Sequence, residues 1–162
     1  MIRSPLSLTL ATPDATARLA QHLGALLRPG DCLLLDGPIG AGKTHFSRHM
    51  VQSLMDLPED VPSPTFTLVQ TYDTRAGELW HADLYRLSSP EEIEELGLGE
   101  AMETAICLIE WPDRLGPLTP PDALRLRFAP IDADEDSRHL TLSWSAPRWT
   151  VLLAQLDELA HA

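Results

Sequence analysis

Residues 32–54 read CLLLDGPIGAGKTHFSRHMVQSL, and this stretch decides the fold class. The apolar run from Cys32 to Leu35, bounded by Gly30 and Gly37, predicts a short strand buried on both faces. A glycine-rich loop follows it, and a helix is expected from within that loop to about Leu54. A buried strand, a glycine-rich turn and a helix in this order indicate an α/β domain.

The loop also matches the pattern G-x-x-x-x-G-K-[ST]. Its glycines let backbone N–H groups turn toward phosphate oxygens, and the N-terminus of the following helix adds partial positive charge. Lys43, the only lysine in the chain, would supply mobile charge for the β- and γ-phosphates, and the Thr44 hydroxyl would bind Mg²⁺. The predicted nucleotide site comprises Gly37, Pro38, Ile39, Gly40, Ala41, Gly42, Lys43, Thr44 and His45.

The single lysine favours ATP over GTP, because GTPases that resemble the Ras class read guanine with a lysine-containing N-K-x-D motif. A phosphate loop also needs an acidic side chain at the end of a neighbouring buried strand. Glu110 ends the run AICLIE and is the best candidate for holding Mg²⁺. Asp83, in HADLYR, is either a second functional acid or a hydrogen-bonded residue of a hairpin.

The rest of the chain continues the alternation of strands and helices expected of one three-layer domain over residues 1–162, with a mainly parallel central sheet and antiparallel hairpin additions. Period-two runs predict hairpins around residues 74–77 and 131–137 and a first strand at 6–10. Helices are predicted from Pro13 to about Leu27, from Pro90 to about Leu96, and over residues 147–160.

The composition of the chain limits the classes of binding partner that it suits. The chain has 24 acidic and 12 basic residues and a formal charge of −12, which disfavours direct binding of nucleic acid and suits a basic protein partner better. Cys32 and Cys107 lie in apolar runs typical of buried free thiols. The N-terminus indicates a strand rather than a signal peptide, and no run reaches membrane-spanning length, so a cytoplasmic location is expected.

Five segments, GPIGAGKTHFSR, VPSPTFTLVQTY, HADLYRL, EELGLGE and LIEWPDRL, resemble in order the motifs of the bacterial TsaE (YjeE) family. The resemblance covers about residues 7 to 145 and implies a small P-loop NTPase-like ATPase needed for threonylcarbamoyladenosine at position 37 of tRNA. It implies ATP and Mg²⁺ at Lys43 and Thr44, a switch-like segment containing Thr65, functional acids at Asp83 and Glu110, and Trp111 in the site.

The resemblance also implies partners. Members of this family bind the TsaB–TsaD heterodimer, which transfers the threonylcarbamoyl group, and their ATP hydrolysis resets that complex between turnovers. Contact with tRNA would be indirect, through the complex, and neither DNA nor a membrane is an expected partner. The chain departs from the family pattern at Pro38, Ile39 and His45, and Pro38 removes one backbone N–H from the loop.

Two other functions fit the same phosphate loop. A small-molecule or nucleoside kinase would need an arginine-bearing lid, which the scattered Arg114, Arg125 and Arg127 do not obviously form. A nucleotide-binding interaction module would sense ATP and hydrolyse it negligibly. Turnover rate, oligomeric state, the partner docking face and the division of labour between Asp83 and Glu110 remain open at this point.

Overall fold

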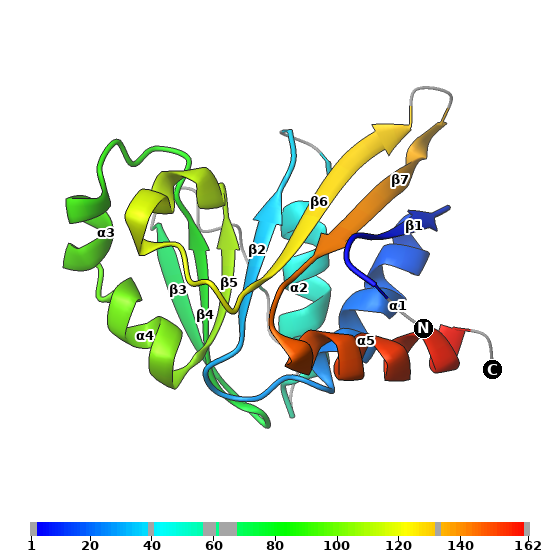
Figure 1. Cartoon of the computed structure of the whole chain (residues 1–162), viewed down its shortest axis with the longest axis horizontal. Coiled ribbons are helices and arrows are strands. Elements are labelled where there is room, and N and C mark those ends of the chain that lie inside the picture. Colours follow the sequence, from blue (N-terminus) through cyan, green and yellow to red (C-terminus); the bar gives the residue numbers. More distant parts are fainter. Residues whose placement is uncertain (1–2, 39–40, 57–60, 62–67, 132–133, 161–162) are drawn as a thin grey trace.

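The computed structural model describes residues 3–38, 41–56, 61, 68–131 and 134–160 (Figure 1). Within these ranges the strands are β1 Leu6–Leu10, β2 Cys32–Asp36, β3 Val69–Thr74, β4 Gly77–Asp83, β5 Ile106–Glu110, β6 Leu124–Ile131 and β7 Asp134–Ser143. The helices are α1 Pro13–Gly24, α2 Lys43–Ser53, α3 Pro90–Glu95, α4 Leu98–Thr104, the 3₁₀ segment η1 Pro112–Leu118, and α5 Pro147–Ala160.

The described strands form one sheet in the order β1-β7-β6-β2-β5-β4-β3. The four central strands, β6, β2, β5 and β4, run parallel to one another. The hairpins β3–β4 and β6–β7 add antiparallel strands on either side, and β1 pairs antiparallel with β7. The predicted α/β class with a mainly parallel centre and antiparallel hairpins is therefore confirmed.

Helices cover both faces of the sheet, which gives three layers (Figure 1). Successive side chains of a strand point to opposite faces, so Leu33 and Leu35 pack toward α1, α2 and α5 while Cys32 and Leu34 pack toward α3, α4 and η1. Both cysteines are buried free thiols, as predicted, and burial raises the pKa of Cys107 to about 12. Among the described helices, none is both long and apolar enough to span a bilayer.

Local signals placed most elements correctly. Thr12 caps α1, and its hydroxyl accepts a hydrogen bond from the Ala15 N–H at 3.1 Å. The helix ends at Gly24, earlier than the predicted Leu27, because the chain tightens into turns in which Leu26 and Leu27 bond to carbonyls three residues back.

Two described elements were not predicted. Helix α4 follows α3 after Gly97, which takes a left-handed φ of 80° and so allows the chain to start a second helix directly. The segment η1 follows β5 and packs against α3. Strand β4 ends at Asp83, so Tyr85 lies beyond the strand whose one face carries His81 and Asp83.

Candidate functional site

The phosphate-loop sequence lies between the carboxyl end of β2 and the start of α2. Gly37 has a φ of +141°, and a Cβ atom there would meet the Phe128 carbonyl oxygen at 2.5 Å. Only glycine fits this position without a backbone shift. Gly42 takes φ 106° as the N-cap of α2, and the Ala41 N–H donates to the Pro38 carbonyl at 3.1 Å. The loop thus turns sharply and presents the N-terminus of an eleven-residue helix.

Lys43 is the first residue of α2 and is only 5% exposed. Its Nζ donates to the Gly37 carbonyl at 2.6 Å and lies 3.7 Å from the centroid of the Trp111 ring. Burial lowers the pKa of Lys43, and the carboxylates of Glu110, Asp83 and Asp36 oppose that shift. The ammonium group is therefore held by an aromatic face and a carbonyl in a negative environment, and no carboxylate of the described residues bonds to it directly.

Glu110 ends β5 beside Asp83, which ends β4, because the two residues pair in the parallel register. The Thr44 hydroxyl donates to Glu110 Oε1 at 2.9 Å. On its other side, His81 Nε2 lies 2.6 Å from Glu110 Oε2, and both side chains are buried. One carboxylate thus joins the start of α2 to the neighbouring strand β4.

Asp83 is buried at the same edge, and its Oδ1 accepts a hydrogen bond from the Tyr85 N–H at 3.0 Å. The half-exposed Tyr85 ring packs against Trp111 with centroids 4.8 Å apart. Trp111 itself has a positive φ of 58°, which turns the chain sharply after Glu110. The turn directs the indole toward Lys43 rather than along the strand.

The structure therefore gathers many of the predicted site residues at the carboxyl edge of the sheet, where open α/β sheets bind ligands: Gly37, Ala41, Gly42, Lys43, Thr44, Asp83, Glu110 and Trp111. Pro38 is exposed in the loop. The His45 imidazole turns away to α1, where its Nε2 lies 3.0 Å from the Pro13 carbonyl oxygen. Ile39, Gly40 and Thr65 lie outside the described residues.

Three residues at this edge were not predicted as parts of the site. Asp36 accepts a hydrogen bond from the Gly37 N–H at 2.9 Å and lies 3.8 Å from both Arg125 and Arg127. Arg138, on β7, donates from Nε to the Ala41 carbonyl at 3.0 Å and so supports the loop from the far hairpin. The third is His81; its place two residues before Asp83, on the same strand face, was the available signal.

The donor set at this edge suits a hard divalent cation bound together with a nucleotide. The Thr44 hydroxyl and the Glu110 carboxylate are oxygen ligands of the kind that Mg²⁺ prefers. Over the described ranges, no cluster of three His, Cys, Asp or Glu side chains forms a metal cage of its own. Mg²⁺ typically binds through one or two protein ligands plus substrate phosphates, so this sparse set fits a nucleotide-borne Mg²⁺.

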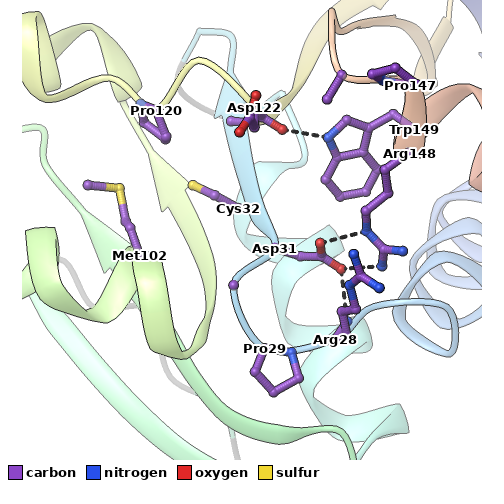
Figure 2. Close-up of a pocket in the computed structure, with 13 residues that line it drawn as sticks. Arg28, Pro29, Asp31, Cys32, Met102, Pro120, Asp122, Pro147, Arg148 and Trp149 are labelled. Atoms are coloured by element: carbon purple, nitrogen blue, oxygen red, sulfur yellow. Dashed lines mark hydrogen bonds and ion pairs between the residues drawn. The ribbon is translucent and has the colours of Figure 1, made fainter.

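A cavity of about 450 Å³ opens at the opposite, amino edge of the sheet (Figure 2). Its polar walls are bonded within the chain. The buried Asp31 accepts from Arg148 at 2.8 and 2.6 Å and from the Arg28 N–H at 2.8 Å. The Trp149 indole donates to the Asp122 carbonyl at 2.7 Å (Figure 2). These contacts tie the entry to β2 to the start of α5 and identify this edge as structural.

The sequence of the chain also matches known proteins. A family model described as "Threonylcarbamoyl adenosine biosynthesis protein TsaE" matches residues 10–140. The tRNA threonylcarbamoyladenosine biosynthesis protein TsaE of Rickettsia felis is 40% identical over 128 residues, or 79% of this chain and 75% of that protein. The Bacillus subtilis protein of the same name is 34% identical over 146 residues, or 90% of this chain and 89% of that one.

The fold agrees with these matches. A crystal structure of Bacillus subtilis YdiB matches with a TM-score of 0.79 and 26% sequence identity, and the match covers 99% of each chain. The resemblance drawn from the five sequence motifs is therefore confirmed, as is the P-loop NTPase-like fold class. The chain belongs to the TsaE family, which takes part in the biosynthesis of threonylcarbamoyladenosine in tRNA.

Proposed function

We propose that the chain binds ATP with Mg²⁺ at the carboxyl edge of the sheet and hydrolyses it slowly, in support of tRNA modification by a TsaB–TsaD complex. The observation that carries this proposal is the convergence of Lys43, Thr44 and Glu110 at the N-terminus of α2. Burial disfavours the charged form of Lys43, and three nearby carboxylates favour it. The direct partners of the ammonium group are nevertheless a ring face and a carbonyl oxygen. A phosphate group would give the ammonium a stronger, charge-assisted partner.

Each residue has a separate task in this proposal. The N-terminus of α2 and the loop N–H groups bind phosphate oxygens, and Lys43 moves from Trp111 to the β- and γ-phosphates. Thr44 and Glu110 would hold Mg²⁺, Glu110 through a water molecule, and the cation would supply positive charge beside the phosphoryl group that is transferred. Asp83, beside Glu110 in the register, positions the attacking water or the switch segment.

Family membership and charge support the proposed partner. Hydrolysis in this proposal acts on TsaB–TsaD and contacts tRNA only through that complex, in the cytoplasm. The formal charge of −12 makes a direct, tight contact with tRNA unfavourable because both surfaces are negative. ATP is thus used to time a partner's chemistry, and no phosphoryl group is passed to a metabolite.

The first test measures nucleotide binding by titration calorimetry with MgATP for the wild type and Lys43→Ala. Loss of a charge-assisted contact of about 1.5–3 kcal/mol predicts an affinity roughly ten to a hundred times weaker. Arg18→Ala, which removes an exposed cation from α1, is the matched control and should bind as the wild type does. Equal affinity of Lys43→Ala and wild type would contradict the site assignment.

The second test reconstitutes tRNA modification from purified TsaB, TsaD and this chain. Multiple turnovers are expected with the wild-type chain, and only residual turnover without it or with Lys43→Ala. Hydrolysis measured in single turnover with and without TsaB–TsaD should show stimulation by the complex. Full multi-turnover activity in the absence of the chain would refute the proposed role.

A further inference from the structure

His81 is a fully buried polar side chain near the carboxyl edge of the sheet. It lies on β4, two residues before Asp83, the last residue of that strand. Its Nε2 lies 2.6 Å from Glu110 Oε2, the shortest contact that Glu110 makes. Its other ring nitrogen, Nδ1, is buried, and none of the described residues offers it a hydrogen-bond partner. Buried polar atoms are bonded in most native structures, so an unsatisfied Nδ1 needs a reason.

The geometry identifies which nitrogen carries the proton. An ionised Glu110 has only acceptor oxygens, so at 2.6 Å the Nε2 atom must donate an N–H. A proton on Nδ1 would place a buried N–H with no acceptor among the described residues, and leaving a buried donor unpaired costs about 1–3 kcal/mol. The contacts therefore favour the tautomer that carries its proton on Nε2.

A purely structural side chain would be apolar here. Leu79, on the same face of β4, and Leu108, opposite His81 in the register, are both fully buried and apolar. An apolar side chain at position 81 would bury no unsatisfied nitrogen. What histidine adds is a donor to Glu110, so the unsatisfied Nδ1 is the consequence of placing Nε2–H on that carboxylate.

We propose that His81 is a positioning residue for the Mg²⁺ site, which fixes the Glu110 carboxylate through its Nε2–H. With Oε2 held from β4, Oε1 stays beside the Thr44 hydroxyl at the start of α2. Residues that orient a metal-site carboxylate in this way typically change metal affinity by 10–100-fold when they are removed. This inference rests on the proposed function, because it assumes that Mg²⁺ binds at Thr44 and Glu110.

The test compares His81→Leu, which removes the donor, with His81→Gln, whose side-chain amide can place an N–H near the position of Nε2. Two affinities are measured for each: that of ADP in EDTA, and that of Mn²⁺ for the protein–ADP complex by electron paramagnetic resonance. His81→Leu should weaken Mn²⁺ binding about tenfold or more and leave ADP binding in EDTA unchanged. His81→Gln should recover most of the Mn²⁺ affinity. His139→Leu, which alters an exposed histidine of β7, should change neither affinity.

A second measurement does not depend on any variant. Long-range ¹H–¹⁵N correlation spectra of ¹⁵N-histidine-labelled wild type report the tautomer of each ring, with His81→Gln used to assign its signals. The proposal expects the proton of His81 on Nε2. A proton on Nδ1 alone would overturn it, because Nε2 could then not donate to Glu110.

The outcomes separate this inference from the proposed function. If the wild type binds no Mn²⁺ together with ADP, the proposed function fails at the metal site. If the wild type binds Mn²⁺ and His81→Leu binds it equally well, only the role of His81 is refuted. An equal loss of metal-free and metal-dependent binding in both variants would show that His81 merely maintains the fold, and would also refute it.

Discussion

At the amino edge of the sheet the buried carboxylate of Asp31 receives hydrogen bonds from Arg148 and Arg28. At the carboxyl edge Lys43 lies on a tryptophan ring, and His81 has one ring nitrogen with no partner among the described residues. Both edges bury charged or polar groups beside loops. The amino edge pairs its buried carboxylate with an arginine, whereas the carboxyl edge holds its lysine on a ring face and a carbonyl oxygen. The contrast separates a structural cluster from the proposed binding site within the same sheet.

The pKa values of Arg148 and Lys43 shift in opposite directions. The hydrogen bond from Arg148 to Asp31 raises the pKa of Arg148, so the fold favours its charged form. Burial lowers the pKa of Lys43 from 10.5, so the fold disfavours the ammonium group despite three nearby carboxylates. A cation that the fold itself disfavours is suited to an anionic ligand, because the ligand supplies the missing compensation.

The largest expected effect on stability comes from a substitution at the amino edge. Arg148→Ala leaves Asp31 buried with one backbone partner, and loss of one member of a buried pair predicts a fall of about 3 kcal/mol in the free energy of unfolding. Urea denaturation followed by circular dichroism measures the fall, and calorimetry should show unchanged affinity for MgATP. If Arg148→Ala were as stable as wild type, the ion pair between Arg148 and Asp31 would not stabilise this edge.

The counterpart at the carboxyl edge is Lys43→Met, measured in the same denaturation experiment. Because the pKa of Lys43 is lower in the folded chain than 10.5, the charged lysine is a net burden on the fold, and the variant should be no less stable than wild type at neutral pH. The difference should shrink as the pH rises through the lowered pKa and past 10.5, above which wild-type Lys43 is neutral in both states. A clear loss of stability in Lys43→Met would contradict the contrast between the two edges.

Much of this architecture could be predicted because its signals are local. The glycine spacing around Lys43, the apolar run that ends at Glu110 and the alternation in the two hairpins each lie within a few residues of sequence. The cap at Thr12 is local as well. Element types followed from these patterns, and the position of Glu110 at the carboxyl edge of the sheet followed from the end of its strand.

The remainder depends on which strands become neighbours. The bond from His81 to Glu110 exists because β4 and β5 pair in parallel, and the support that Arg138 gives to Ala41 exists because β7 reaches across to the phosphate loop. No short stretch of sequence predicts either of these long-range contacts. The helix α4 was missed for a local reason: Gly97 and Gly99 are poor helix formers in isolation, and their segment is stabilised by tertiary burial of Leu98.

A smaller effect on stability is expected where the loop meets β6. Gly37→Ala places a Cβ 2.5 Å from the Phe128 carbonyl oxygen at a φ of +141°, and strain of this kind predicts a loss of about 2 kcal/mol in the free energy of unfolding. The matched control is Gly99→Ala in α4, where no atom lies within 4 Å of the added Cβ and a gain of about 0.5 kcal/mol is expected. Gly37→Ala should also weaken MgATP binding, unlike Arg148→Ala. Unchanged stability and unchanged affinity in Gly37→Ala would show that the loop tolerates the shift.

The smallest expected effect concerns the contact that Lys43 would leave on binding. Departure of the ammonium from the ring face, 3.7 Å from its centroid, should change the fluorescence of Trp111 when MgADP is added. Trp111→Phe should abolish that change and alter MgADP affinity by less than about fivefold, since a cation–π contact is worth about 0.5–1 kcal/mol. Trp80→Phe, which alters a tryptophan in the middle of β4, should keep the response. A fluorescence change that persists in Trp111→Phe would mean that Lys43 does not leave the ring for a phosphate group. That result would contradict the contrast between the two edges.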